Sequence, residues 1–151
     1  MVGTIKIFVC DDHPIVVDGL SWLFEKNDQV DLVGVARWEP NTLAFIAQTN
    51  PEILFFDHRQ LHDSCVSAAD VRRSLREVKF IVFSAGVTVI ETMQALDQGA
   101  AGVVLKSSPL HVIEEAVRRV AAGDNFLDEG IARNLAFHAG RLQGNESYPG
   151  L

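Results

Sequence analysis

Four short apolar runs in this chain each end at a side chain suited to phosphate or metal chemistry. The runs and the residues that follow them are 7–10 with Asp11 and Asp12, 53–56 with Asp57, 80–83 with Ser84, and 102–105 with Lys106. Such runs are typical of strands that are buried on both faces of a parallel sheet. Ligands of open α/β sheets bind beyond the carboxyl ends of the strands, where the strand order reverses. The sequence therefore predicts one site that holds three carboxylates, a hydroxyl and an ammonium.

This set of groups favours phosphoryl transfer assisted by a hard cation. Carboxylates that crowd one edge of a sheet repel one another and recruit a positive ion. Mg²⁺ accepts one or two carboxylates, keeps several waters and shares phosphate oxygens. Ser84 and Lys106 are then suited to hold the remaining phosphoryl oxygens, because the reaction depends mostly on positioning and charge neutralisation. Asp57 can be the nucleophile that becomes an aspartyl phosphate.

Strand-like and helix-like patterns alternate along the chain, which predicts an α/β fold with crossover connections. Strands are expected at residues 7–10, 30–36, 53–56, 80–83 and 102–105. Helices are expected at residues 14–24, 42–48, 66–76, 89–97 and 109–122, with a further short helix at 129–137. Ser108 is the expected N-cap of the fifth helix, with Pro109 as its first residue. The tail after Gly140 is typical of a linker.

Composition places the chain among acidic, globular proteins. It has 151 residues, 48% of them hydrophobic, which fits one domain with a real core. The net charge of −7 gives it no basic footprint for nucleic acid or an anionic membrane. Two cysteines are too few for a disulfide framework, and Cys10 is expected to be a small buried hydrophobe. We therefore expect a soluble, cytoplasmic protein with no membrane partner.

Several motifs, in register with these elements, resemble a known family. They are DDHP at residues 11–14, VDGL at 17–20, GAAGVVLK at 99–106 and AAGDNFL at 121–127. Together they resemble the receiver domains of bacterial two-component response regulators, over roughly residues 5–122, and within them the NarL/FixJ (LuxR-type) branch. The resemblance implies a flavodoxin-like, three-layer αβα fold with a five-stranded parallel sheet in the order 2-1-3-4-5. Together with the patterns above, it divides the chain into a receiver domain over residues 1–123, an extra helical region over 124–139 and a linker over 140–151.

The resemblance assigns roles to individual residues. It implies Asp57 as the phosphoacceptor, with Ser84 and Lys106 in contact with the phosphoryl group. The Mg²⁺ ligands that it implies are Asp11 (directly or through water), Asp12, Asp57 and the backbone carbonyl of Arg59. Such receivers take the phosphoryl group from a sensor histidine kinase and assist their own phosphorylation and dephosphorylation, without being enzymes in other respects. Phosphorylation then changes homodimerisation and DNA binding by a helix-turn-helix domain, expected beyond residue 151.

Departures from the family pattern keep a second interpretation open. Residues 60–62 are Gln, Leu and His where receivers commonly have Met, Pro and Gly, and Val103 replaces a usual aromatic residue. The alternative is a degenerate receiver that acts as a phosphorylation-independent interaction module. A hydrolase with Asp57 as its nucleophile ranks last, because haloacid-dehalogenase-type enzymes would need an acid where Arg59 stands. His13 is expected to border the acidic pocket without serving as a general base.

Overall fold

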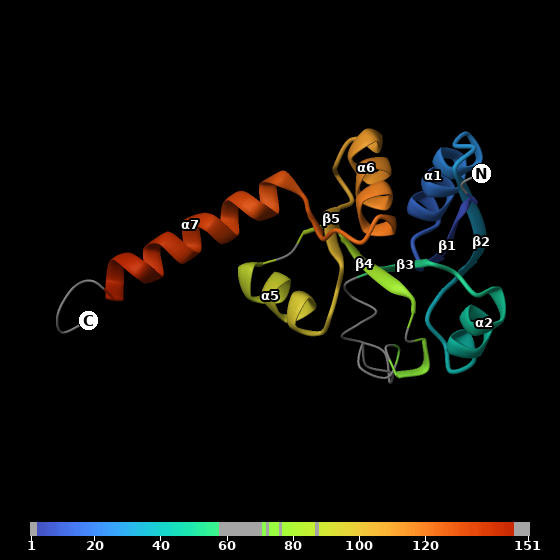
Figure 1. The fold of residues 1–151 in the computed structure, drawn as a ribbon, viewed down its shortest axis with the longest axis horizontal. Coiled ribbons are helices and arrows are strands. Elements are labelled where there is room, and N and C mark those ends of the chain that lie inside the picture. The colour runs from blue at the N-terminus through green and yellow to red at the C-terminus, as the bar shows by residue number, and fades with distance from the viewer. Residues whose placement is uncertain (1–2, 58–70, 72, 76, 87, 147–151) are drawn as a thin grey trace.

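A computed structural model describes residues 3–57, 71, 73–75, 77–86 and 88–146 of the protein, and it contains one parallel sheet between two layers of helices (Figure 1). The strands are β1 (Ile5–Cys10), β2 (Val30–Ala36), β3 (Ile53–Asp57), β4 (Lys79–Ser84), β5 (Gly102–Leu105) and β6 (Phe126–Leu127). Their order is β2-β1-β3-β4-β5-β6, and every neighbouring pair is parallel. The predicted parallel α/β fold and the strand order 2-1-3-4-5 are confirmed. The two-residue β6, which adds a sixth strand beside β5, was not predicted.

The helices divide between the two faces of the sheet. They are α1 (Pro14–Glu25), α2 (Thr42–Thr49), α5 (Val89–Asp97), α6 (Leu110–Ala121) and α7 (Glu129–Glu146). One core cluster joins alternate strand residues such as Ile7 and Val9 to the buried faces of α1 and α6. The other joins the residues between them, such as Phe8 and Cys10, to α2 and α5. Because successive strand residues point to opposite faces, the unbroken apolar runs supply both cores at once.

The pairing of β1 with β2 depends on a glycine. Gly34 lies opposite Phe8, directly after an irregularity in the register between Ile7 and Phe8. A Cβ atom on Gly34 would lie 2.5 Å from Cε2 of Phe8 and 3.2 Å from Cε1 of Phe45. The rings of Phe8 and Phe45 meet edge to face, with centroids 5.5 Å apart. The missing side chain of Gly34 therefore leaves room for the ring of Phe8, which packs against Phe45 of α2.

The predicted N-cap of α6 is wrong. Pro109 holds the N-cap position, in extended backbone conformation, and makes no side-chain capping bond. The hydroxyl of Ser108 instead donates to a carboxylate oxygen of Asp128. Asp128 also accepts a hydrogen bond of 3.2 Å from the backbone N–H of Gly130, in the first turn of α7. The hydroxyl of Ser108 therefore bonds to Asp128 and does not cap α6. Through these two hydrogen bonds, Asp128 connects the turn after β5 to the start of α7.

The last helix is longer than the sequence predicts. The pattern indicated a helix over 129–137 and a linker from Gly140, but α7 continues without a break to Glu146 and extends away from the sheet (Figure 1). Glycine costs about 1 kcal/mol inside a helix, and no proline or cap stops the helix before residue 146. The division into domains beyond the receiver stays a prediction. No helix among the described residues is both long and apolar enough to cross a membrane.

The expected helix over 66–76 falls largely outside the described residues. Within it, the backbone N–H of Leu75 donates to the carbonyl of Val71 at 2.8 Å, and both side chains are buried on the α5 side of the sheet. The predicted C-terminal cap of α5 is confirmed. Gly99 follows the helix with φ +97°, a left-handed conformation that glycine adopts without a steric penalty.

The close approach of Phe8 to Gly34 leads to a stability prediction. We expect Gly34→Ala to lower the free energy of unfolding by about 1–3 kcal/mol, because the new methyl group overlaps a fully buried ring. Gly19→Ala is the matched control: its Cβ would meet nothing within 4 Å on α1, so it should raise stability by roughly 0.5–1 kcal/mol. Urea denaturation measures both changes, and equal effects of the two substitutions would contradict the packing argument.

Candidate functional site: an acidic pocket at the sheet edge

The sheet topology brings the polar residues that follow its strands together. β1 lies between β2 and β3, so the strand order reverses there. Cys10 pairs with Phe56 in the register of these strands, which sets Asp11 and Asp57 side by side at their carboxyl ends. On the other side of β3, the backbone N–H of Lys106 donates to the carbonyl of Ser84 at 2.6 Å, which extends the ladder between β4 and β5. The predicted site therefore lies at the switch point of the sheet.

Lys106 bridges the two buried carboxylates. Its Nζ atom lies 2.7 Å from Oδ2 of Asp11 and 2.9 Å from Oδ2 of Asp57. The side chains of Asp11 and Asp57 are only 2% and 3% exposed, and that of Lys106 is 12% exposed. Charges removed from water interact strongly, and a single ammonium leaves the two buried carboxylates with an excess of negative charge. Asp12, whose side chain is 51% exposed, adds a third carboxylate at the mouth.

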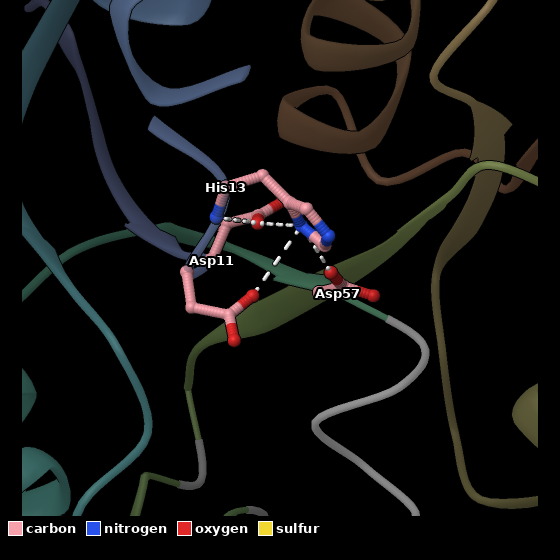
Figure 2. Close-up of side chains that lie close together, drawn as sticks. Asp11, His13 and Asp57 are labelled. Carbon is pink, nitrogen blue, oxygen red and sulfur yellow. Dashed lines mark hydrogen bonds and ion pairs between the residues drawn. The ribbon is translucent and has the colours of Figure 1, made fainter. Parts of the chain in front are cut away.

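His13 lies inside this cluster and not only at its border (Figure 2). Its Nδ1 atom is 2.7 Å from Oδ1 of Asp11, 3.3 Å from Oδ1 of Asp12 and 3.1 Å from Oδ2 of Asp57. The backbone N–H of His13 also donates to Oδ1 of Asp11 at 2.8 Å. This turn directs the imidazole back over the carboxylates. The sequence carried a hint, because His13 directly follows the acidic pair, but residue spacing alone does not fix the direction of a side chain.

The donor atoms fit a divalent cation. One carboxylate oxygen from each aspartate and one ring nitrogen of His13 all lie within 4.8 Å of one another. Oδ2 of Asp11 is buried without a hydrogen-bond partner, although Lys106 lies within ion-pair distance. The ammonium of Lys106, 2.7 Å away, is the charge partner of this oxygen, and Oδ1 of the same carboxylate faces His13. Carboxylate oxygens are the ligands that Mg²⁺ prefers.

Ser84 faces the same pocket but is bonded within its own loop. Its hydroxyl donates to the carbonyl of Gly86 at 3.0 Å and accepts from the backbone N–H of Gly86 at 3.2 Å. Ser84, Asp57 and Lys106 line one open cavity of about 650 Å³, together with residues of α1 and α5. The predicted carbonyl ligand, Arg59, and the unusual residues 60–62 lie outside the described residues. The structure thus brings Lys106 into direct contact with Asp11 and Asp57, links Asp12 to them through His13, and places Ser84 on the cavity wall.

Cys10 is buried directly beneath the pocket, as the sequence predicts. Its side chain is fully covered in the α5-side core. Burial, followed by the negative charges of Asp11, Asp57 and Asp12, raises the pKa of the Cys10 thiol from 9.0 to about 12. A thiolate at this position would be a further negative charge in an already acidic region. The thiol is therefore held neutral as part of the core.

Comparison with known proteins identifies a family for this arrangement. The family model described as a response regulator receiver domain matches residues 7–118, well over half of the chain. The matched segment contains every residue of the acidic pocket. The chain spans 60 to 67% of the length of the first curated relatives, so it resembles only part of those proteins.

Individual relatives show the level of similarity. The response regulator GacA of Pseudomonas aeruginosa is 27% identical over 148 residues, which cover 95% of this chain and 67% of that protein. The solved receiver domain of the response regulator NarL of Mycobacterium tuberculosis is 29% identical, with a TM-score of 0.70 over 80% of this chain and 98% of that chain. A structure of two RcsB dimers bound to two parallel DNAs shares the fold at 21% identity, with a TM-score of 0.79 over 89% of this chain and 69% of that chain.

The buried thiol predicts an alkaline loss of stability. As pH rises above 9.0, the unfolded Cys10 releases its proton while the folded one keeps it until about 12, so the free energy of unfolding falls across this interval. Urea denaturation over that interval measures the slope, in a Cys65→Ser background that removes the other cysteine. The double variant that also carries Cys10→Ala is the control and should show a shallower slope. Parallel slopes for the two proteins would contradict the assignment.

Proposed function

Because the chain belongs to the response regulator receiver family, we propose that Asp57 is a phosphoacceptor that a sensor histidine kinase phosphorylates. The proposal is carried by one observation. The Asp57 carboxylate is 3% exposed at the end of β3, 2.9 Å from the Lys106 ammonium, and it faces the two other aspartates across the pocket. Such a group combines a nucleophilic oxygen with the positive charge that orients it.

The transfer follows from these positions. A carboxylate oxygen of Asp57 attacks the phosphorus of a phosphohistidine, the P–O bond forms and the P–N bond breaks. The leaving imidazole of the kinase takes a proton from water. Lys106 stays beside Asp57 and faces the negative charge of the phosphoryl oxygens, which the 2.9 Å contact already allows. The chain supplies positioning and charge, and it needs no further catalytic base.

Asp11, Asp12 and Asp57 would hold Mg²⁺, and the carbonyl of Arg59 belongs to the same proposal. When bound, Mg²⁺ neutralises carboxylate and phosphoryl oxygens that would otherwise repel each other. Asp11 would contribute a carboxylate that is only 2% exposed. Asp12 contributes a half-exposed carboxylate at the mouth of the pocket. The Lys106 ammonium alone cannot balance three carboxylates and a phosphoryl group.

Ser84 would couple the presence of the phosphoryl group to the position of α5. To contact a phosphoryl oxygen, its hydroxyl has to leave Gly86, which it both donates to and accepts from. This exchange would move the loop that leads to α5, whose start is held by the capping box of Thr88 and Glu91. Val103 is fully buried and has no ring to rotate, so the change would pass through the backbone of this loop.

The output of the protein would be transcriptional. The curated relatives include a transcriptional regulatory protein, and they are longer than this chain. We propose that phosphorylation promotes a homodimer and that DNA is bound by a helix-turn-helix domain outside residues 1–151. The RcsB structure shows that combination of dimers and DNA for RcsB itself. A histidine kinase partner would meet the protein in the cytoplasm.

The phosphoacceptor role is tested by mass spectrometry after incubation with acetyl phosphate and Mg²⁺. The wild-type chain should gain one phosphoryl group and Asp57→Asn none, because the amide is a poor nucleophile. Asp31→Asn, which removes an exposed carboxylate on β2, is the matched control and should be phosphorylated like wild type. Equal phosphorylation of Asp57→Asn would remove the assignment. Failure of the wild-type chain to react would favour the degenerate-receiver alternative.

A further inference from the structure

The imidazole of His13 contacts all three aspartates of the described acidic cluster, Asp11, Asp12 and Asp57. Its Nδ1 atom approaches one oxygen of each aspartate to between 2.7 and 3.3 Å. It also lies 3.1 Å from Nζ of Lys106. An imidazole that merely bordered the pocket would not place the same nitrogen against three acids from two strand ends. Neither the fold nor the phosphoacceptor chemistry of Asp57 requires this contact.

We propose that His13 Nδ1 is a ligand of the divalent cation and gives the pocket a preference for transition ions such as Mn²⁺ over Mg²⁺. This inference rests on the proposed function to the extent that the pocket has to bind a cation. It adds a nitrogen to a set of ligands that is otherwise made of oxygen. It therefore makes His13 a residue that determines which metal the pocket selects.

The distances match those between neighbouring ligands around one ion. Ligands at roughly 2.0–2.2 Å from a six-coordinate ion lie roughly 3 Å from each adjacent ligand. Nδ1 of His13 lies 2.7, 3.3 and 3.1 Å from oxygens of Asp11, Asp12 and Asp57. One donor atom from each of the four residues also lies within 4.8 Å of the other three, a spread that two opposite ligands of one ion satisfy. These spacings are compatible with four ligands around one ion.

The chemistry of the donor set gives the direction of the preference. Mg²⁺ favours oxygen ligands and gives up its waters reluctantly. Imidazole nitrogen is a good ligand for first-row transition ions, whose affinities depend on the type of donor atom. The nitrogen of His13 should therefore strengthen binding of Mn²⁺ more than binding of Mg²⁺. Lys106 remains the ion-pair partner of Asp11 and Asp57 and supplies no lone pair.

His13 is free to serve the pocket because the fold does not need its ring. It is the N-cap residue of α1, yet its side chain makes no capping bond, and Pro14 starts the helix without an N–H to satisfy. The side chain is 42% exposed, so its removal leaves no cavity in the core. A His13→Ala variant should fold normally and change only the pocket.

Isothermal titration calorimetry with Mg²⁺ or Mn²⁺, on the full chain, tests the preference. The proteins are wild type, His13→Ala and His138→Ala, which removes an exposed histidine on α7 and controls for surface binding. We expect His13→Ala to lower the ratio of Mn²⁺ to Mg²⁺ affinity by at least roughly tenfold. Pulsed electron paramagnetic resonance of bound Mn²⁺ should show a directly coordinated ¹⁴N in wild type and His138→Ala, and none in His13→Ala.

Each other outcome is distinct. An unchanged affinity ratio together with no ¹⁴N coupling in wild type overturns the ligand assignment and leaves Mg²⁺-dependent phosphorylation intact. Tighter binding of both ions by His13→Ala also overturns it, because the imidazole would then compete with the ion for the carboxylates. If neither wild type nor His13→Ala binds Mg²⁺ or Mn²⁺, the metal-dependent part of the proposed function fails together with this inference.

Discussion

The excess of negative charge at the end of β1 and β3 is the constraint on which the pocket depends. Asp11 and Asp57 are almost fully buried, and the single ammonium of Lys106 lies between them. Burying unbalanced charge is unfavourable, so this arrangement persists only because the surrounding sheet fixes it. The strand ladders supply that rigidity: Asp11 donates its backbone N–H to Ala36, and Lys106 donates its own to Ser84. A pocket held in this way has a built-in affinity for positive charge.

The position of Lys106 is fixed by the sheet and also by hydrogen bonds of the turn that follows it. Ser108, two residues later, is bonded to Asp128, which also caps the first turn of α7 through Gly130. The backbone N–H of Asp128 donates to the carbonyl of Val103 in β5. The short β6 therefore matters beyond its length, because it brings the acid that holds the turn after Lys106. The same contacts connect the edge of the pocket to the long C-terminal helix.

Much of this architecture could be predicted from the sequence, and the features that could not be predicted have identifiable physical reasons. Unbroken apolar runs mark doubly buried strands, so the residues that follow them were assigned to one edge correctly. The strand order came from the family resemblance, since periodicity contains no information on neighbours. A two-residue strand such as β6 has no period to detect. The partner of Ser108 lies 20 residues away, and local capping rules do not reach that far. Helix α7 passes through Gly140 because propensity is a weak barrier when nothing else ends the helix.

Because Val103 stands where an aromatic residue is usual, a structural change in the pocket cannot be transmitted by rotation of a ring at this position. Val103 is fully covered in the core cluster that also contains Ala95 of α5 and Ile131 of α7. A close-packed core transmits displacements between the elements that it joins. The hydroxyl of Ser84 is bonded to the backbone at Gly86, two residues before Thr88, the N-cap of α5. Under the proposed function, a change at Ser84 would therefore reach the start of α5 through the backbone, without an aromatic side chain at position 103.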